Sequence, residues 1–294
     1  MSPGAPPGQL RVALIVARFA LRESLRRKVF VIVGLLTLVF LALYGLATWQ
    51  AFEAADEFAA GSDAGVEPDT VVGATLAGLA MFAILFLGAI LAVFLTLGAV
   101  RGDAERGLLQ PLVVRPVGRT SLLVGRFTGA VAVCAVYVAL VYATAVLITG
   151  ITGAWWPDHG VGPGVGLVLA VVVIAAISLL GSIFLSSTAN GIAVFMLFGA
   201  GLAAGLLGQI GDALAVQTLE DVATVFSWVL PFEALYQEGL HGLTAETSGI
   251  TGVIVQLGPF GGAQNAGAGL WVWTVAYLGL IAGGAHVAFA RRDL

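Results

Sequence analysis

Few side chains in this sequence have the types and spacing that catalysis or metal binding needs. The only lysine is Lys28, and no glycine-rich loop precedes it and no Ser or Thr follows it, as a phosphate-binding P-loop requires. His159, His241 and His286 are far apart in the sequence, and Cys134 is the only cysteine, so no metal-ligand spacing is present. We therefore expect a chain that is not an enzyme, carries no cofactor or metal, and does not hydrolyse ATP itself.

The polar chemistry that the sequence does offer is concentrated in one stretch, residues 101–126. This stretch is charged at its start, amphipathic in its middle, and broken by Pro111 and Pro116. Such a segment is suited to contact another protein, although an ordinary basic connector between membrane helices would also contain several arginines.

The composition indicates what must position this stretch. Hydrophobic residues make up 59% of the 294 residues and charged residues 10%, against roughly 45–50% and about 25% in a typical soluble domain. Crossing a bilayer takes about 20 apolar residues in a helix, and six stretches without Asp, Glu, Lys or Arg meet that need. They are Val29–Trp49, Val71–Val100, Phe127–Ile151, Val165–Leu185, Gly191–Ile210 and Leu270–Ala290. The sequence predicts an all-α polytopic membrane protein with six spans.

Basic residues predict the orientation of these spans. All 13 Lys and Arg lie before the first span, between the second and third, or after the sixth. Six spans place these three segments on one face, which the positive-inside rule makes cytoplasmic. We therefore expect both termini to be cytoplasmic. We also expect a location in the plasma (cytoplasmic) membrane of a bacterial or archaeal cell, and no nucleic-acid partner. The absence of charge inside the spans also argues against ion-coupled transport.

Three segments outside the spans complete the predicted organisation. Residues 1–28 place arginines on one helical face and are expected to lie along the inner membrane surface. Residues 211–269 form an outer segment, in which Val222–Phe232 is too short to span and is expected to be interfacial or re-entrant. In the same segment, a second apolar run at Ile250–Phe260 is expected to be extended. Residues 29–290 are expected to form the six-span membrane domain, and residues 291–294 a cytoplasmic tail after it.

The stretch 101–126 resembles the corresponding loop of the ABC transporter type-2 permease family, which typically has an acidic residue, Gly-Thr, a leucine-rich turn and Pro-x-x-Arg before the third span. Glu105, Gly107, Leu108-Leu109, Pro116 and Arg119 occupy those places. Leu108 stands where the family usually has threonine, and Gln110-Pro111 interrupts the helix expected there.

Four further segments are similar to features of the same family. Phe184–Asn190 resembles the short Ser-rich turn between spans four and five, and Phe289–Leu294 resembles the aromatic-x-x-Arg-Asp ending. The basic lead-in looks like the family's amphipathic elbow helix, and Leu230–Phe232 like its Pro-containing outer segment before span six.

The resemblance implies the permease subunit of an ATP-driven transporter, an exporter of unidentified substrate. It implies a second permease subunit, the same or different, two separate ABC ATPase subunits that bind ATP and Mg, and membrane lipid around the spans. It also implies contact with the ATPase through the loop residues Asp103, Glu105, Arg106, Gly107, Pro116 and Arg119, and a second cytoplasmic turn containing Ser186, Ser187, Thr188 and Asn190. The alternatives are a membrane scaffold that recruits a cytoplasmic partner, or an ATP-independent channel or carrier.

Overall fold

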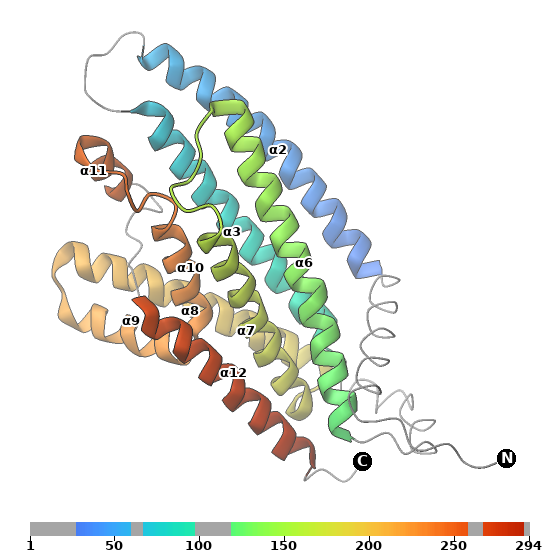
Figure 1. Ribbon diagram of the computed structural model, residues 1–294. Helices are drawn as coiled ribbons and strands as arrows, with labels where there is room; N and C mark the ends of the chain where they lie inside the picture. The colour runs from blue at the N-terminus through green and yellow to red at the C-terminus, as the bar shows by residue number, and fades with distance from the viewer. Residues whose placement is uncertain (1–27, 60–66, 98–118, 258–266, 291–294) are drawn as a thin grey trace.

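The structure, a computed structural model, describes residues 28–59, 67–97, 119–257 and 267–290, and every regular element in these ranges is a helix. The helices are α2 (Lys28–Ala59), α3 (Pro68–Thr96), α6 (Arg119–Gly153), α7 (Gly162–Phe184), α8 (Ser187–Leu214), α9 (Gln217–Val229), α10 (Pro231–His241), α11 (Gly249–Leu257) and α12 (Gly267–Ala290) (Figure 1). The all-α prediction is confirmed. The expected elbow helix within residues 1–28 and the tail 291–294 lie outside the described residues, apart from residue 28.

Six of these helices, α2, α3, α6, α7, α8 and α12, are long and apolar enough to cross a membrane. They correspond one to one with the six predicted spans. The helix α2 continues past the predicted end at Trp49 to Ala59, because Ala and Glu residues that favour helix follow the apolar run. The helix α3 begins with Pro68 in its first turn and Asp69 beside it, a proline position and a charge that both suit a helix N-terminus.

Two ends of the helix bundle are named here for reference. The loop end is where α3 and α7 end, where α6 and α8 begin, and where α12 ends. The hairpin end is the opposite one, where α2 ends and α3, α7 and α12 begin.

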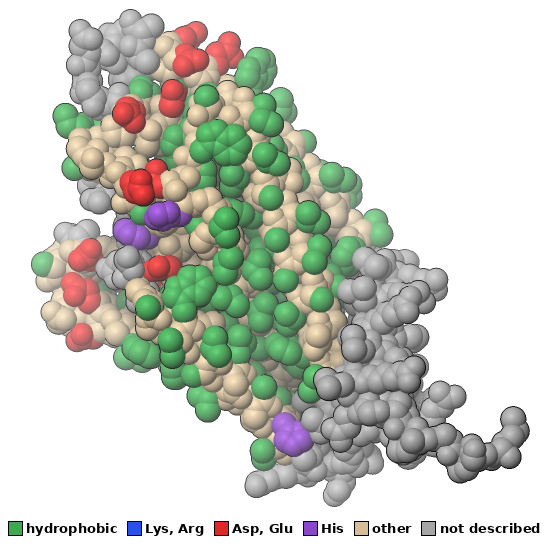
Figure 2. Space-filling view, viewed as in Figure 1, with side chains coloured by type: hydrophobic (Ala, Val, Ile, Leu, Met, Phe, Trp, Pro, Cys, Tyr) green, Lys and Arg blue, Asp and Glu red, His purple; other side chains and the backbone are tan. Residues whose placement is uncertain are grey.

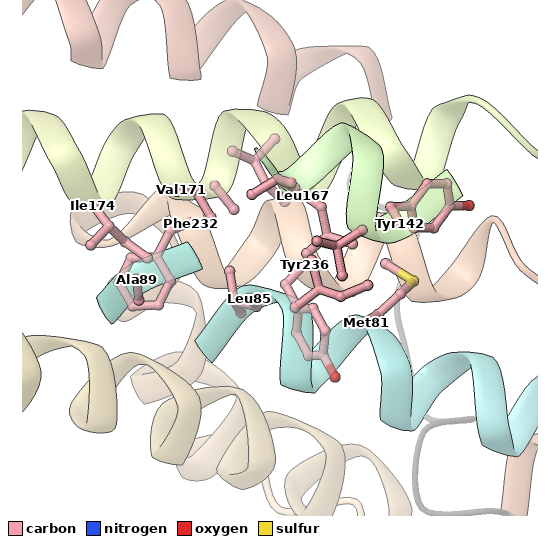
Figure 3. Close-up of a cluster of buried hydrophobic side chains, with 14 of the residues drawn as sticks. Met81, Leu85, Ala89, Tyr142, Leu167, Val171, Ile174, Phe232 and Tyr236 are labelled. Carbon is pink, nitrogen blue, oxygen red and sulfur yellow. The ribbon is translucent and has the colours of Figure 1, made fainter. Parts of the chain in front are cut away.

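The centre of the bundle consists of α3 and α7, which are the most buried of the six spans. Their facing side chains include Leu85, Leu167 and Ile174, each at most 1% exposed, and the short helix α10 packs against them (Figure 3). The surrounding spans α2, α8 and α12 keep large apolar side chains on their outer faces. Such faces are suited to contact lipid, because the bilayer core is as apolar as the side chains themselves.

Two tyrosine–threonine pairs join α2 to α6. Thr37 Oγ1 lies 2.6 Å from Tyr137 Oη, and Tyr44 Oη lies 2.6 Å from Thr149 Oγ1. Each pair takes one residue from each helix, with the tyrosine on α6 in the first pair and on α2 in the second. These hydrogen bonds position α2, which buries little of its own surface.

The helices α9 and α10 form a hairpin between spans α8 and α12. The helix α9 runs antiparallel to α8, with Ala223 close to Gly208. The chain breaks at Leu230–Pro231, and α10 returns toward the hairpin end. The ring of Phe232 stacks on Phe198 at a centroid distance of 5.7 Å, so the apex of this α9–α10 hairpin lies beside the middle of α8. The geometry is that of a re-entrant segment, one of the two alternatives that the sequence left open for Val222–Phe232.

Aromatic side chains of α12 satisfy the backbone carbonyls at the apex of the α9–α10 hairpin. Trp273 Nε1 donates a hydrogen bond to the carbonyl oxygen of Trp228 at 3.0 Å, and Tyr277 Oη donates to that of Val229 at 2.8 Å. A helix break at membrane depth is tolerated only where its freed backbone groups find such partners.

The second apolar run of the outer segment is helical. Its described part forms α11 and is not extended, so that expectation was wrong. Thr251 of α11 lies against the start of α3, where its Oγ1 accepts a hydrogen bond from the backbone N–H of Glu67 at 3.0 Å. This packing supplies the tertiary partner for a helix of only nine residues, which in isolation would be marginal in water.

Candidate functional site

The predicted ATPase-contacting loop lies almost entirely outside the described residues. Asp103, Glu105, Arg106, Gly107 and Pro116 are not described, and Arg119 is described only as the first residue of α6. The structure does describe the two ends between which the loop is held. The helix α3 ends at Thr96, and α6 begins at Arg119 toward the same end of the bundle.

The second predicted element, the turn between α7 and α8, is described in full. Leu185 and Ser186 have extended backbones, which separate the two helices. Ser186 and Thr188 are exposed, Ser187 is half-buried and Asn190 is buried. The backbone N–H of Asn190 donates to the carbonyl oxygen of Ser186 at 2.9 Å and closes the first turn of α8. The turn therefore presents hydroxyl groups outward and one amide inward.

The buried amide of Asn190 belongs to a polar cluster that joins three spans. Its Nδ2 donates to the carbonyl oxygen of Ser178 on α7 at 2.9 Å. The hydroxyl of Ser178 lies 2.7 Å from that of Thr96, the last residue of α3. We call Thr96, Ser178 and Asn190 the polar joint. It links the start of α8 and the C-terminal half of α7 to the last residue of α3, the span that precedes the predicted ATPase-contacting loop.

The amide oxygen of Asn190 is the one buried side-chain polar atom without a hydrogen-bond partner among the described residues. It packs against Gly181, where a Cβ would overlap it. A buried acceptor left without a donor costs about 1–3 kcal/mol. The contact with Gly181 and the hydrogen bond to Ser178 together hold the Asn190 side chain in place despite this cost.

Glu233 is a residue of possible function that the sequence reasoning did not single out as a site. Glu233 follows the short apolar run Val222–Phe232 in the sequence, and the structure places it in the first turn of α10, with 6% of its surface exposed. It is the only charged side chain that is buried among the described residues. An acidic residue two positions after Pro231 indicates a helix N-terminus, but it does not indicate that the side chain is buried.

The carboxylate of Glu233 faces α8. Its Oε1 accepts a hydrogen bond from Gln237 Nε2 at 2.8 Å, and Gln237 Oε1 in turn accepts from Gln209 Nε2 on α8 at 3.2 Å. Gly205 leaves the space that the carboxylate occupies, because a Cβ there would overlap Oε1. Burial raises the pKa of the Glu233 carboxyl to about 7, and the hydrogen bond from Gln237 opposes that rise.

Acidic side chains are distributed toward the hairpin end and along the adjoining side of the molecule (Figure 2). They include Glu53 and Asp56 at the end of α2 and Asp69 at the start of α3. Asp158 has a structural partner there, because its Oδ2 accepts a hydrogen bond from the backbone N–H of Glu246 at 2.9 Å. No group of three or more potential metal ligands occurs in the described part of the chain.

Comparison with known proteins gives one match. Residues 14–294 match the family model described as ABC-2 family transporter protein. The match covers all six spans, the α9–α10 hairpin and the segments that contain both groups of predicted site residues. No curated protein matches the chain.

Proposed function

The chain belongs to the ABC-2 family of transporter proteins, and from this premise we propose that it is the membrane-spanning permease subunit of an ATP-driven exporter. Two separate ABC ATPase subunits would bind ATP and Mg on the cytoplasmic side, and a second permease subunit would complete the pathway. The observation that carries the proposal is the match over residues 14–294, together with six spans in one helical bundle. The lack of a P-loop agrees with an energy source outside this chain.

The polar joint offers a path by which a conformational change of the ATPase subunits could reach the spans. A push on the loop after α3 would act on Thr96, whose hydroxyl contacts Ser178, and through Ser178 on Asn190. The spans α3, α7 and α8 would then tilt together, because the same three residues join them at the loop end. In this proposal Glu105 and Arg106 contact the ATPase, Gly107 and Pro116 shape the contacting helix, and the hydroxyls of Ser186, Ser187 and Thr188 lie on the same cytoplasmic face.

Purification and reconstitution test the proposal. A tagged chain isolated from its native membrane should recover an ABC ATPase, and liposomes containing the complex should hydrolyse ATP and move substrate. The chain alone should show no ATPase activity. Recovery of an ATPase without ATP-dependent transport would instead indicate a scaffold, and transport without any ATPase would indicate a channel or carrier.

A single substitution tests the predicted contact. Removing one partner of a buried charge pair costs about 2–5 kcal/mol, whereas an exposed pair contributes about 0–1 kcal/mol. Glu105→Ala should therefore weaken assembly at least tenfold or uncouple hydrolysis from transport, with normal membrane insertion. Glu246→Ala, which changes an exposed residue at the hairpin end, is the matched control and should behave as wild type. Wild-type assembly and transport in Glu105→Ala would reduce the loop to a connector.

A further inference from the structure

The α9–α10 hairpin places a carboxylate inside a bundle whose six spans contain no charge in their apolar cores. Glu233 lies within one turn of the hairpin apex, and the neighbouring Phe232 contacts the middle of α8 through Phe198 and Gly201. Figure 3 shows Phe232 beside Val171 and Ile174 of α7. The carboxylate therefore lies inside the bundle, away from the hairpin end, although it belongs to a helix outside the six spans.

The surroundings of this carboxylate do not balance a negative charge. Its one hydrogen-bond partner among the described residues is the neutral amide of Gln237. Burying an ionised carboxylate costs several kcal/mol in lost hydration. A hydrogen bond to a charged group offsets only about 1.5–3 kcal/mol of that cost. The packed arrangement therefore favours the neutral carboxylic acid.

Other titratable groups on the surrounding helices leave this balance in place. Tyr236 is the one neighbouring group whose pKa the Glu233 charge affects. Burial raises the pKa of its phenol most, and the Glu233 charge raises it further. The remaining groups on the packed helices are Asp69 of α3, Asp212 of α8, Glu220 and Asp221 of α9, Glu238 and His241 of α10, and Tyr277 and His286 of α12. None of them perturbs the pKa of the Glu233 carboxyl, and α7 contributes no ionisable side chain.

The hydrogen-bonded chain from Glu233 through Gln237 to Gln209 joins the hairpin to α8 by side chains alone. We propose that Glu233 is a proton-binding site that latches the α9–α10 hairpin onto α8, taking up one proton when the hairpin packs and releasing it when the hairpin separates. On proton uptake, one O–H bond of an aqueous hydronium ion breaks and one O–H bond forms on the Glu233 carboxylate, leaving water. On release, the carboxylic acid returns the proton to water at the hairpin end and becomes a carboxylate again.

The consequence for transport rests on the function proposed above. If the hairpin separates from α8 during each cycle, the cycle includes proton release and uptake at Glu233, and its rate depends on the pH at the hairpin end. A group with a pKa of about 7 loses about nine-tenths of its protonated population between pH 6 and pH 8. The latched population should fall with it.

Infrared spectroscopy of the full chain in lipid nanodiscs tests the protonation directly. The absorbance of the carbonyl-stretch band of the Glu233 carboxylic acid should decrease about tenfold between pH 6 and pH 8. This decrease should be absent in Glu233→Gln. The matched control Glu246→Gln should retain it. A titrating band that persists in Glu233→Gln, or a band that titrates near the ordinary glutamate pKa of 4.5, would overturn the proposal.

Hydrogen exchange tests the latch and does not depend on transport. After correction for intrinsic rates, the backbone amides of residues 232–241 should exchange severalfold faster at pH 8 than at pH 6 in the wild type and equally at both pH values in Glu233→Gln. Gly205→Ala adds the Cβ that overlaps the carboxylate, and it should abolish the pH dependence while Glu233 is retained. Equal exchange at both pH values in the wild type would refute the latch.

Transport assays separate failure of this proposal from failure of the proposed function. In reconstituted complex, the ATP-driven rate should change severalfold between pH 6 and pH 8 at the hairpin end, and the rate in Glu233→Gln should be flat. A transporter with equally pH-dependent wild-type and Glu233→Gln rates would overturn the protonation site alone. A chain with no ATP-driven transport but with the infrared titration intact would overturn only the proposed function.

Discussion

The side-chain amide of Asn190 donates from Nδ2 to the carbonyl oxygen of Ser178, 2.9 Å away, and so bridges the turn between α7 and α8. Asn190→Leu removes this donor and leaves a carbonyl near the end of α7 without it. We expect a loss of about 0.5–1.5 kcal/mol in the free energy of unfolding, because the buried Ser178 carbonyl loses one of its hydrogen bonds. Denaturation of the purified chain in detergent micelles measures it.

Gly181→Ala tests the same contact from the opposite side. Its Cβ would overlap Asn190 Oδ1, so we expect a destabilisation of about 1–3 kcal/mol, as for other overpacked sites. Thr188→Ala changes an exposed hydroxyl in the same turn and should remain within about 0.5 kcal/mol of wild type. Equal stability of all three variants would remove the polar joint as a structural link.

The bond between Tyr44 and Thr149 should contribute measurably to the packing of α2 on α6. Thr149 Oγ1 also donates to the carbonyl of Ala145 at 3.0 Å, so Tyr44 supplies the proton of the pair. A double-mutant cycle of Tyr44→Phe and Thr149→Val should give a coupling energy of about 0.6 kcal/mol, with a maximum near 1.7 kcal/mol. A coupling energy of zero would mean that this hydrogen bond does not contribute to the packing of α2 on α6.

The positions of the spans were predictable because an apolar run of membrane length has no other stable environment. Asn190 was named through its resemblance to a family turn, and its contacts with Ser178 depend on how α7 and α8 meet. Glu233 could not be placed from the sequence, since an apolar segment of that length can lie on the membrane surface or enter the bundle. Gly201 and Gly205 on α8 leave the space that Phe232 and the Glu233 carboxylate occupy. That these glycines face the hairpin depends on how α8 and α10 pack, which the sequence does not show.

The orientation of the spans is a prediction that cysteine labelling can test. In a Cys134→Ala background, single cysteines near Asp63 and at Thr247 should react with an impermeant reagent in intact cells, whereas one at Thr120 should react only after lysis. The reason is that every basic residue belongs to the segments assigned to the cytoplasm. The reverse labelling pattern would contradict the assigned orientation.

The apex of the α9–α10 hairpin should depend on donors from α12. Trp273→Phe and Tyr277→Phe each remove one donor to an apex carbonyl. We expect each to destabilise the hairpin by about 1 kcal/mol, seen as roughly fivefold faster hydrogen exchange in Gln217–Val229 in nanodiscs. Val275→Ala, on an exposed face of α12, is the control and should leave exchange unchanged. Unchanged exchange in both aromatic variants would mean that these carbonyls find other partners.

The pH dependence of stability should carry the signature of Glu233. Burial raises the pKa of its carboxyl from the ordinary 4.5 to about 7, so the folded chain binds a proton that the unfolded chain has released between those values. The resulting stabilisation is fully present below pH 4.5, declines as the pH rises to about 7, and is lost above it. Its upper limit is about 3 kcal/mol, at about 1.4 kcal/mol for each pKa unit.

Glu233→Gln should remove this decline, because its neutral amide does not titrate. The measurement is the difference in unfolding free energy between wild type and Glu233→Gln at several values between pH 5 and pH 8, which cancels the contributions of all other groups. The wild type should lose stability relative to the variant as the pH rises. A difference that stays constant, or that moves in the opposite direction, would show that the Glu233 carboxylate is ionised in the folded protein throughout this range.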